Sequence, residues 1–294
     1  MPINMTKNCG TAVKGTGTRG CRTKKKYIER RFLIEKGFKL DVKTDTLDQA
    51  KVTELIQKGI LVPLPVNLGA APNHKEPTYE TIQKQDYYVS GMVFNWGLQF
   101  ESDACLSRSL SALSSKAWDL LEVDEDGFLN VVYTSDGFIK GFDLNLARLE
   151  GMQDNDGTVS AKQTFRIELT KPGSIEYMKE WDTIAPTEVK WMNLQGIDEV
   201  LLTQTVDDKI KVTFACDQSS PIDGLLTANF RALDSSGAAV AGFAVTAEGE
   251  GVYAVTGLTA GQDYTISLYD SIKNTRVIVL ANYFYKSDDL KYTA

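Results

Sequence analysis

The chain of 294 residues has few of the side chains from which catalytic and metal centres are built. It has a single histidine, His74, and no Cys-x-x-Cys pair, whereas zinc sites draw on several histidine or cysteine ligands at short spacing. One histidine could act as a general base, but no nucleophile or second acid accompanies it. A Gly-x-Ser-x-Gly elbow and a Gly-x4-Gly-Lys-Ser/Thr phosphate loop are also missing. The sequence therefore favours a protein that is not an enzyme and holds no cofactor or metal, with His74 exposed in a loop.

Cysteines and long apolar runs are also scarce. Cys9, Cys21, Cys105 and Cys216 are too few and too scattered for a disulfide scaffold. Cys9 and Cys21 could close a loop, but free thiols are favoured if the chain is made in the cytosol. No segment approaches the roughly 20 apolar residues that cross a bilayer, and residues 1–20 lack the apolar stretch of a secretory signal. We therefore expect a soluble protein with no membrane contact.

Charge is distributed unevenly along the chain. Residues 1–43 hold twelve Lys and Arg against three acidic residues, a net charge of +9; since the whole chain carries −7, the remainder carries −16. Residues 1–26 have almost no apolar side chains and cannot bury enough surface to fold alone. We expect a flexible basic arm that docks on an acidic neighbour or, as the alternative, touches nucleic acid weakly. The predicted contacts are Arg19, Arg22, Lys24, Lys25, Lys26, Arg30 and Arg31 on the arm, and Asp124 and Asp126 on a receiving subunit.

Two kinds of motif suggest ligand binding but have simpler explanations. Residues 15–20 match Gly-x-Gly-x-x-Gly, yet a dinucleotide site needs a strand before this motif, and only fourteen largely polar residues precede it. The acidic loops at residues 124–127 and 154–157 contain carboxylates of the kind that bind calcium. Neither loop has the spacing of an EF-hand. Hairpin turns are the favoured interpretation of both loops.

The middle of the chain, residues 44–195, has a β pattern with one helix packed on it. Met92, Phe94, Trp96, Leu98 and Phe100 alternate with other residues, which predicts one strand over residues 88–100 with an apolar face. Leucines at helical spacing predict a helix over residues 103–116, capped by Ser102, that covers this face. Further strands are expected at 60–68, 128–134, 138–149 and 164–170, a short helix at 47–58 beginning at a capping box at 46–49, and a linker at 181–196.

The last third of the chain carries the most informative motif. Leu258-x-x-Gly261-x-x-Tyr264 is typical of a tyrosine corner, in which the leucine enters the core, the glycine turns the chain and the hydroxyl bonds a backbone group upstream. Seven alternating segments surround it, at 199–205, 209–216, 225–233, 239–246, 251–256, 263–269 and 276–285. The predicted fold is mainly β: a flexible basic arm (1–43), a β-sandwich or barrel-like assembly domain with a packed helix (44–195), and a seven-stranded immunoglobulin-like sandwich (196–294).

This combination of a basic arm, a β-rich domain with one helix, paired strands around residues 136–142 and a C-terminal module with a tyrosine corner resembles the structural proteins of tailed bacteriophages. The most similar family is the major tail, or tail tube, protein. The resemblance implies a virion protein that assembles in the cytoplasm of a bacterial host, forms stacked homo-oligomeric rings, hexameric in a tail tube, and contacts other virion proteins. An acidic body would let DNA slide through the tube without sticking.

Two alternative functions remain open at this point. One is a head decoration protein or another component of the phage head or tail. The other is a surface adhesion or carbohydrate-binding module, in which exposed indole rings would stack on sugars. The candidates for such stacking are Trp96, Trp118, Trp181 and Trp191.

Overall fold

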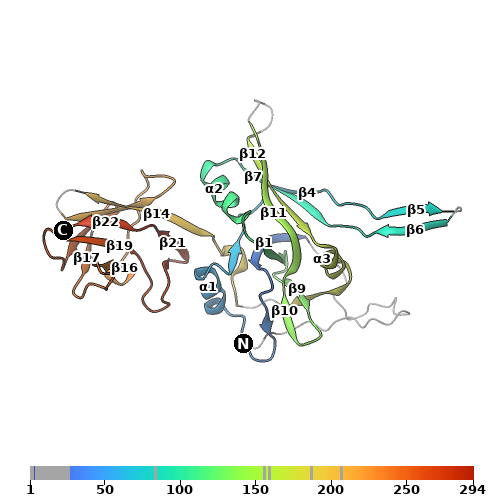
Figure 1. Ribbon diagram of the computed structural model, residues 1–294, viewed down its shortest axis with the longest axis horizontal. Coiled ribbons are helices and arrows are strands. Elements are labelled where there is room, and N and C mark those ends of the chain that lie inside the picture. The colour runs from blue at the N-terminus through green and yellow to red at the C-terminus, as the bar shows by residue number, and fades with distance from the viewer. Residues whose placement is uncertain are drawn as a thin grey trace. The chain divides into compact units, whose positions relative to one another are not determined.

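The computed structural model describes residue 3 and residues 27–82, 85–154, 157, 160–185, 188–205 and 208–294. Within these residues the protein is mainly β, with 22 strands and three α-helices. The chain divides into two compact units (Figure 1). The first unit comprises residues 1–52 and 60–193, and the second comprises residues 53–59 and 194–294.

The first unit is built on a branched antiparallel sheet. Its main path runs β2-β10-β9-β8-β11-β12-β7-β4; β1 pairs with β8 and β3, and β13 pairs with β9. The long strand β11 pairs with β8 at its start and with β12 along the rest of its length, so it links the two halves of the sheet. The strands are β1 (Ile28–Glu35), β2 (Leu40–Asp41), β3 (Leu61–Pro63), β4 (Gly69–Pro72), β5 (Thr78–Ile82), β6 (Gln85–Ser90), β7 (Asn95–Glu101), β8 (Trp118–Asp124), β9 (Leu129–Tyr133), β10 (Phe138–Lys140), β11 (Phe142–Gln153), β12 (Lys162–Leu169) and β13 (Trp181–Ile184).

Alternating apolar residues of several strands form the core of the first unit. Phe165, Ile167 and Leu169 of β12 are fully buried, as their spacing predicts. Trp96, Leu98 and Phe100 of β7 are buried in the same core. The predicted strand over residues 88–100 is nevertheless wrong in its extent, because residues 91–94 separate β6 from β7; among the described residues, β6 pairs only with β5.

Two helices of the first unit accompany this sheet: α2 (Ala104–Leu113) and α3 (Lys171–Ile175), which continues into a π-helical turn, η1 (Glu176–Glu180). Helix α1 (Gln49–Gln57) begins in the first unit and ends in the second. Helix α2 places Leu110 in the core, as predicted, but the cap is Asp103 and not Ser102, since the Asp103 carboxylate accepts from the amides of Cys105 and Leu106. Helix α1 is capped by Asp48, which accepts from the Lys51 amide, and not by a box that begins at Thr46.

Two segments that were expected to lie outside the folded core belong to it. Residues 28–35 form β1, in which Phe32 and Leu33 are fully buried, so the flexible arm does not extend to residue 43. The linker expected at 181–196 contains β13 and a 3-10 turn, η2 (Trp191–Asn193), and buries Ile184, Trp191 and Leu194. Both segments bury apolar side chains in the core. The local sequence of each segment alone does not indicate this burial.

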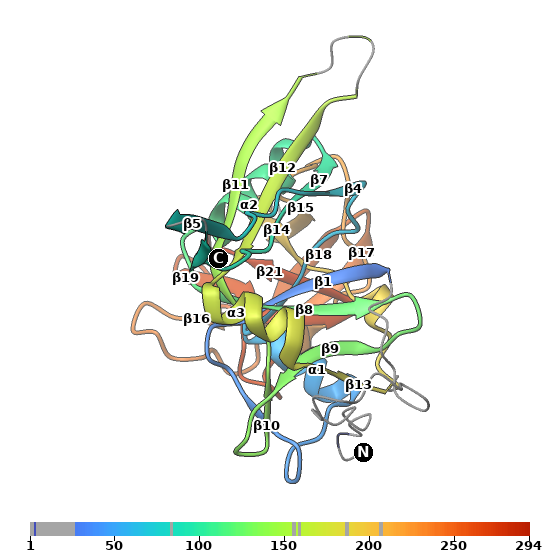
Figure 2. The ribbon, with the colours of Figure 1, turned by 90° about the vertical axis from the view of Figure 1, so that its right-hand side faces the viewer.

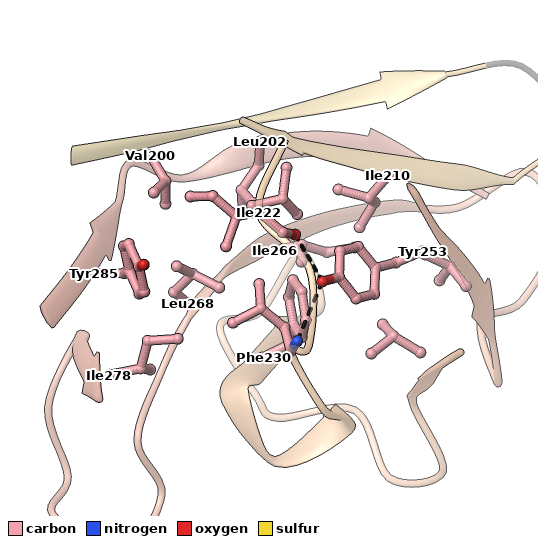
Figure 3. Close-up of a cluster of buried hydrophobic side chains, with 14 of the residues drawn as sticks. Val200, Leu202, Ile210, Ile222, Phe230, Tyr253, Ile266, Leu268, Ile278 and Tyr285 are labelled. Carbon is pink, nitrogen blue, oxygen red and sulfur yellow. Dashed lines mark hydrogen bonds between the residues drawn. The ribbon is translucent and has the colours of Figure 1, made fainter. Parts of the chain in front are cut away.

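The second unit contains two sheets and one apolar core, whose buried side chains are drawn in Figure 3. One sheet has the order β17-β18-β15-β14-β21-β20 and the other β16-β19-β22; among the described strands, only β14 and β21 pair in parallel. The elements are β14 (Ile197–Thr205), β15 (Lys209–Phe214), η3 (Thr227–Asn229), β16 (Phe230–Leu233), β17 (Ala244–Gly249), β18 (Val252–Thr256), β19 (Asp263–Leu268), β20 (Val277–Leu280), β21 (Tyr283–Ser287) and β22 (Leu290–Thr293). The described part of the unit has nine strands and not the expected seven, because residues 276–285 divide into β20 and β21, and β22 follows them.

Two tyrosines fasten loops to the core of the second unit. The Tyr264 hydroxyl accepts from the Thr259 amide at 3.0 Å, around Gly261 with a φ of +73°, and Leu258 packs against the core. Tyr253, which is fully buried, donates its hydroxyl to the Ile222 carbonyl at 2.8 Å and accepts from the Leu225 amide at 3.2 Å (Figure 3). The first contact has the geometry of a tyrosine corner; the second has no sequence signature.

Cysteine chemistry differs from the expectation. Cys105 and Cys216 are both disulfide-bonded, and the part of the chain described has no free cysteine. Their spacing gave no indication of such bonds. Cys9 and Cys21 lie outside the described residues.

Candidate assembly surfaces

A two-stranded arm formed by β5 and β6 projects from the first unit (Figure 1). The strands pair only with each other among the described residues, from Thr78↔Ser90 to Ile82↔Gln85. Figures 1 and 2 show the arm extending away from the sheet, toward the viewer in Figure 2. At about 3.3 Å per residue, the stretch from Lys75 to Ile82 reaches roughly 23 Å. An isolated two-stranded hairpin is marginally stable in water, so an element of this kind gains stability from a partner.

The base of the arm is held firmly by the first unit. Lys75 and Val93 exchange two backbone hydrogen bonds of 3.0 Å, and the Asn73 amide donates to the Asn95 carbonyl at 2.9 Å. The Lys75 ammonium lies 3.1 Å from a Glu168 carboxylate oxygen. These contacts fix the direction in which the arm leaves the sheet.

His74 is part of this base and not a free loop residue, which corrects the expectation from sequence. Its Nδ1 accepts from the Asn95 amide at 3.1 Å, and its ring packs edge-on against Phe94 and Trp96, with centroids 4.9 and 5.2 Å away. Burial lowers the pKa of the His74 imidazole, which favours the neutral ring that can accept the amide hydrogen. The histidine therefore has a structural role at the base of the arm.

A polar network stiffens the sheet next to the arm. The Glu168 carboxylate accepts from Asn95 and Asn145, each at 3.0 Å, in addition to its contact with Lys75. Arg166 donates to the Asn95 side chain at 2.9 Å and to Glu150 at 2.6 Å. Because β7, β11 and β12 are tied together by side chains as well as by backbone bonds, they form a rigid platform for the base.

The first unit also contains a buried ion pair. Arg31 of β1 and Glu122 of β8 lie 3.1 Å apart, with exposed fractions of 7% and 0%. The Arg31 guanidinium also lies 5.9 Å from the centroid of the Trp96 ring. Tyr177 of η1 hydrogen-bonds to Glu122, and burial, followed by the charge of Glu122, raises the pKa of this phenol. The cluster joins β1, β7, β8 and η1 in the interior.

The structure places the predicted interface residues in different environments. Arg30 donates to the carbonyls of Met192 and Leu64 at 2.8 and 3.1 Å and is only 4% exposed, and Arg31 is held by Glu122. Asp124 is buried and accepts from the amides of Asp126 and Phe128, which makes it the cap of the β8–β9 turn. The expectation of a surface contact is therefore wrong for Arg30, Arg31 and Asp124, because their charges serve the fold of this unit.

Asp126 is exposed in the same turn, where Gly127 has a φ of +79°; this agrees with the hairpin interpretation of residues 124–127. Arg19, Arg22, Lys24, Lys25 and Lys26 lie outside the described residues, as does the Gly-x-Gly-x-x-Gly segment at 15–20. Their role as contacts stays a prediction.

The tryptophans do not form a sugar-binding surface. Trp96, Trp118 and Trp191 are buried, with exposed fractions of 7%, 3% and 4%, and Trp181 is half-buried in β13. A sugar ring could reach none of the first three without unfolding the sheet. Their position removes the observation on which the carbohydrate-binding alternative depended.

Among the described residues, no group of three or more His, Cys, Asp and Glu side chains could hold a metal ion, and no helix is long and apolar enough to cross a membrane. No protein-family model matches the chain, and no curated protein matches its sequence. The arm itself was missed by sequence reasoning, because Gln83-Lys84, between the runs that form β5 and β6, is not one of the Gly- or Asn-containing pairs that signal a hairpin turn.

Proposed function

We propose that this protein is a self-assembling structural subunit and that the β5–β6 arm joins neighbouring copies. The observation that carries the proposal is the arm itself: two strands that pair only with each other among the described residues, on a base held by five or more polar contacts. A hairpin whose two strands pair only with each other among the described residues, on a base held by the sheet, suits an element that reaches a second molecule. Docking of the arm would supply the apolar cover that an isolated hairpin lacks.

The finer proposal is a component of a tailed-phage virion, preferably the tail tube, in which the subunits form stacked rings. It is supported by the predominance of strands, by the helix α2 packed on the sheet, and by a second unit with a tyrosine-corner contact. The C-terminal unit is then an immunoglobulin-like module that decorates the ring. Residues 19–26 add a basic segment that contacts an acidic neighbour or, weakly, nucleic acid.

Deleting the arm tests the assembly proposal. Residues 78–90 are replaced by Asn-Gly, a two-residue turn that closes antiparallel strands, so that the base from Asn73 to Lys75 is kept. We expect rings or tubes of the intact protein in electron micrographs, and monomers of the armless variant in light scattering, with an unchanged unfolding temperature.

A matched control shortens a different exposed loop. Residues 271–274 of the second unit, which include Ile272 with 90% exposure, are replaced by the same Asn-Gly turn. This variant should assemble like the intact protein. An intact protein that stays monomeric at every concentration would refute self-assembly, and assembly of the armless variant would refute the role of the arm.

A further inference from the structure

Five ionisable side chains from separate elements meet on one side of the first unit. They are Asp119 at the start of β8, Asp143 at the start of β11, Glu176 in η1, Lys36 in the turn after β1, and Lys140 at the end of β10. Three are carboxylates and two are ammonium groups. The charges therefore do not balance if every group is ionised.

Both lysines are engaged by carboxylates other than Asp119. The Lys36 ammonium lies 2.7 Å from Asp143 Oδ1 and donates to the Leu144 carbonyl at 2.9 Å. The Lys140 ammonium lies 2.6 Å from Glu176 Oε1. The second oxygen of Asp143 accepts from the Thr170 hydroxyl at 2.9 Å. Asp143 and Glu176 are thus compensated, and Asp119 is the carboxyl left over.

Asp119 occupies an unfavourable position for a negative charge. It is 3% exposed and lies directly opposite Asp143 in the register of β8 and β11, where like charges repel. Its Oδ2 accepts from the Gly37 amide at 2.9 Å. Its Oδ1 is buried and has no hydrogen-bond partner within the described residues. A buried carboxylate oxygen without a donor is costly to keep ionised.

We propose that Asp119 Oδ1 holds a proton and that this proton-binding site secures the turn between β1 and β2. One proton brings three carboxylates and two ammonium groups to zero net charge. A hard metal cation would need about six oxygen ligands, whereas the unpaired acceptor is a single buried atom. The proton removes the repulsion across the β8–β11 pair, while Oδ2 keeps its bond to Gly37.

The electrostatic surroundings place the proton on Asp119 and not on Asp143. Burial raises the pKa of Asp119, and the charge of Asp143 raises it further, against the opposing effects of the Gly37 amide, Lys140 and Lys36. Burial also acts to raise the pKa of Asp143, but the hydrogen bonds from Lys36 and Thr170 outweigh it and hold that pKa below its usual value. The pKa of Asp119 is therefore raised and that of Asp143 lowered, so the proton is held by Asp119.

The expected pH dependence follows from the raised pKa. A carboxyl that binds its proton more tightly in the folded state stabilises the fold most below its unfolded pKa; this stability is lost as the pH rises through the folded pKa and stays lost above it. Within that window the ratio of folded to unfolded protein falls by up to about tenfold per pH unit. Asp182 and Asp198, whose pKa values burial also raises, act in the same direction. The measured quantity is therefore the difference between the intact protein and a variant.

The test compares urea unfolding of the intact protein, Asp119→Asn and the exposed-turn control Asp136→Asn from about pH 4 to about pH 9. We expect the intact protein to lose stability relative to Asp119→Asn as the pH rises, and the control to follow the intact protein. Infrared difference spectra should show a protonated carboxyl band in the intact protein that disappears at alkaline pH and is missing in Asp119→Asn.

Two results would overturn the proposal. Parallel pH profiles for the intact protein and Asp119→Asn would mean that Asp119 does not titrate in this range. A stability that depends on the identity of the salt cation, in sodium, potassium and choline chloride at equal ionic strength, would place a metal ion where the proton is proposed. If Asp119→Asn does not fold, the infrared titration is carried out on the double variant Asp182→Asn/Asp198→Asn, which removes the two other carboxyls with raised pKa values. A protonated carboxyl band should remain in that variant, and its absence would overturn the proposal.

Discussion

Replacing Arg31 by methionine should destabilise the first unit strongly. The change keeps most of the side-chain volume but removes the guanidinium that lies 3.1 Å from Glu122, whose side chain is 0% exposed. Breaking a buried ion pair by removing one partner leaves an uncompensated charge and typically costs about 3–5 kcal/mol. This is a large share of the roughly 5–15 kcal/mol that keeps a domain folded. The free energy of unfolding, measured in urea and followed by tryptophan fluorescence, gives the loss directly.

A double substitution distinguishes the lost charge pair from lost packing. In Arg31→Met/Glu122→Leu both charges are gone, and buried pairs replaced by apolar residues of similar size are often neutral or even more stable. We therefore expect the double variant to recover most of the stability that the single variant loses. A loss below about 1 kcal/mol for Arg31→Met, the size found for exposed pairs, would refute the reasoning, as would a double variant less stable than the single one.

Three further substitutions probe packing and loop anchors. Tyr253→Phe should lower the free energy of unfolding by about 1–3 kcal/mol, because it leaves the Ile222 carbonyl and the Leu225 amide without their side-chain partner. Tyr264→Phe removes only the contact with the Thr259 amide and should cost about 1 kcal/mol. Thermal unfolding should therefore show a lower melting temperature for Tyr253→Phe than for Tyr264→Phe. Gly173→Ala should cost about 1–3 kcal/mol, since the new Cβ would meet the Asp143 carbonyl oxygen in the first turn of α3. Gly151→Ala is its control, because nothing lies within 4 Å of that Cβ, and equal melting temperatures for both glycine variants would contradict this account.

Local periodicity predicted the elements whose own residues form a face. The alternation of Phe165, Ile167 and Leu169 places three large side chains on the same side of β12, and the leucine spacing around Leu110 identifies α2. Each of these two elements is indicated by the spacing of apolar residues within its own short segment. It can therefore be predicted from the sequence without knowing which strands pair.

The elements that were missed depend on distant partners. Arg30 and Arg31 indicate an exposed basic strip when read locally, but their partners Met192 and Glu122 lie 162 and 91 residues away. The same holds for β13, which becomes a strand only because β9 offers an edge to it. The Asp119–Asp143 pair is likewise created by strand register, which sequence spacing does not specify.

The second unit is built from two separate segments of the chain, residues 53–59 and 194–294, so it can be completed only late in synthesis. Gln57 donates to the Val277 carbonyl at 2.9 Å and to Asp270 at 3.1 Å, across 220 and 213 residues. Residues 53–59 therefore leave the ribosome long before the strands that they contact exist. Each doubling of the length of such a loop adds about 0.6 kcal/mol to the entropy cost of closing it, and closure must wait for translation to reach residue 277. A nascent chain cut short before that point leaves residues 53–59 without these partners, so damage near the C-terminus should be detectable as protease sensitivity more than 200 residues upstream.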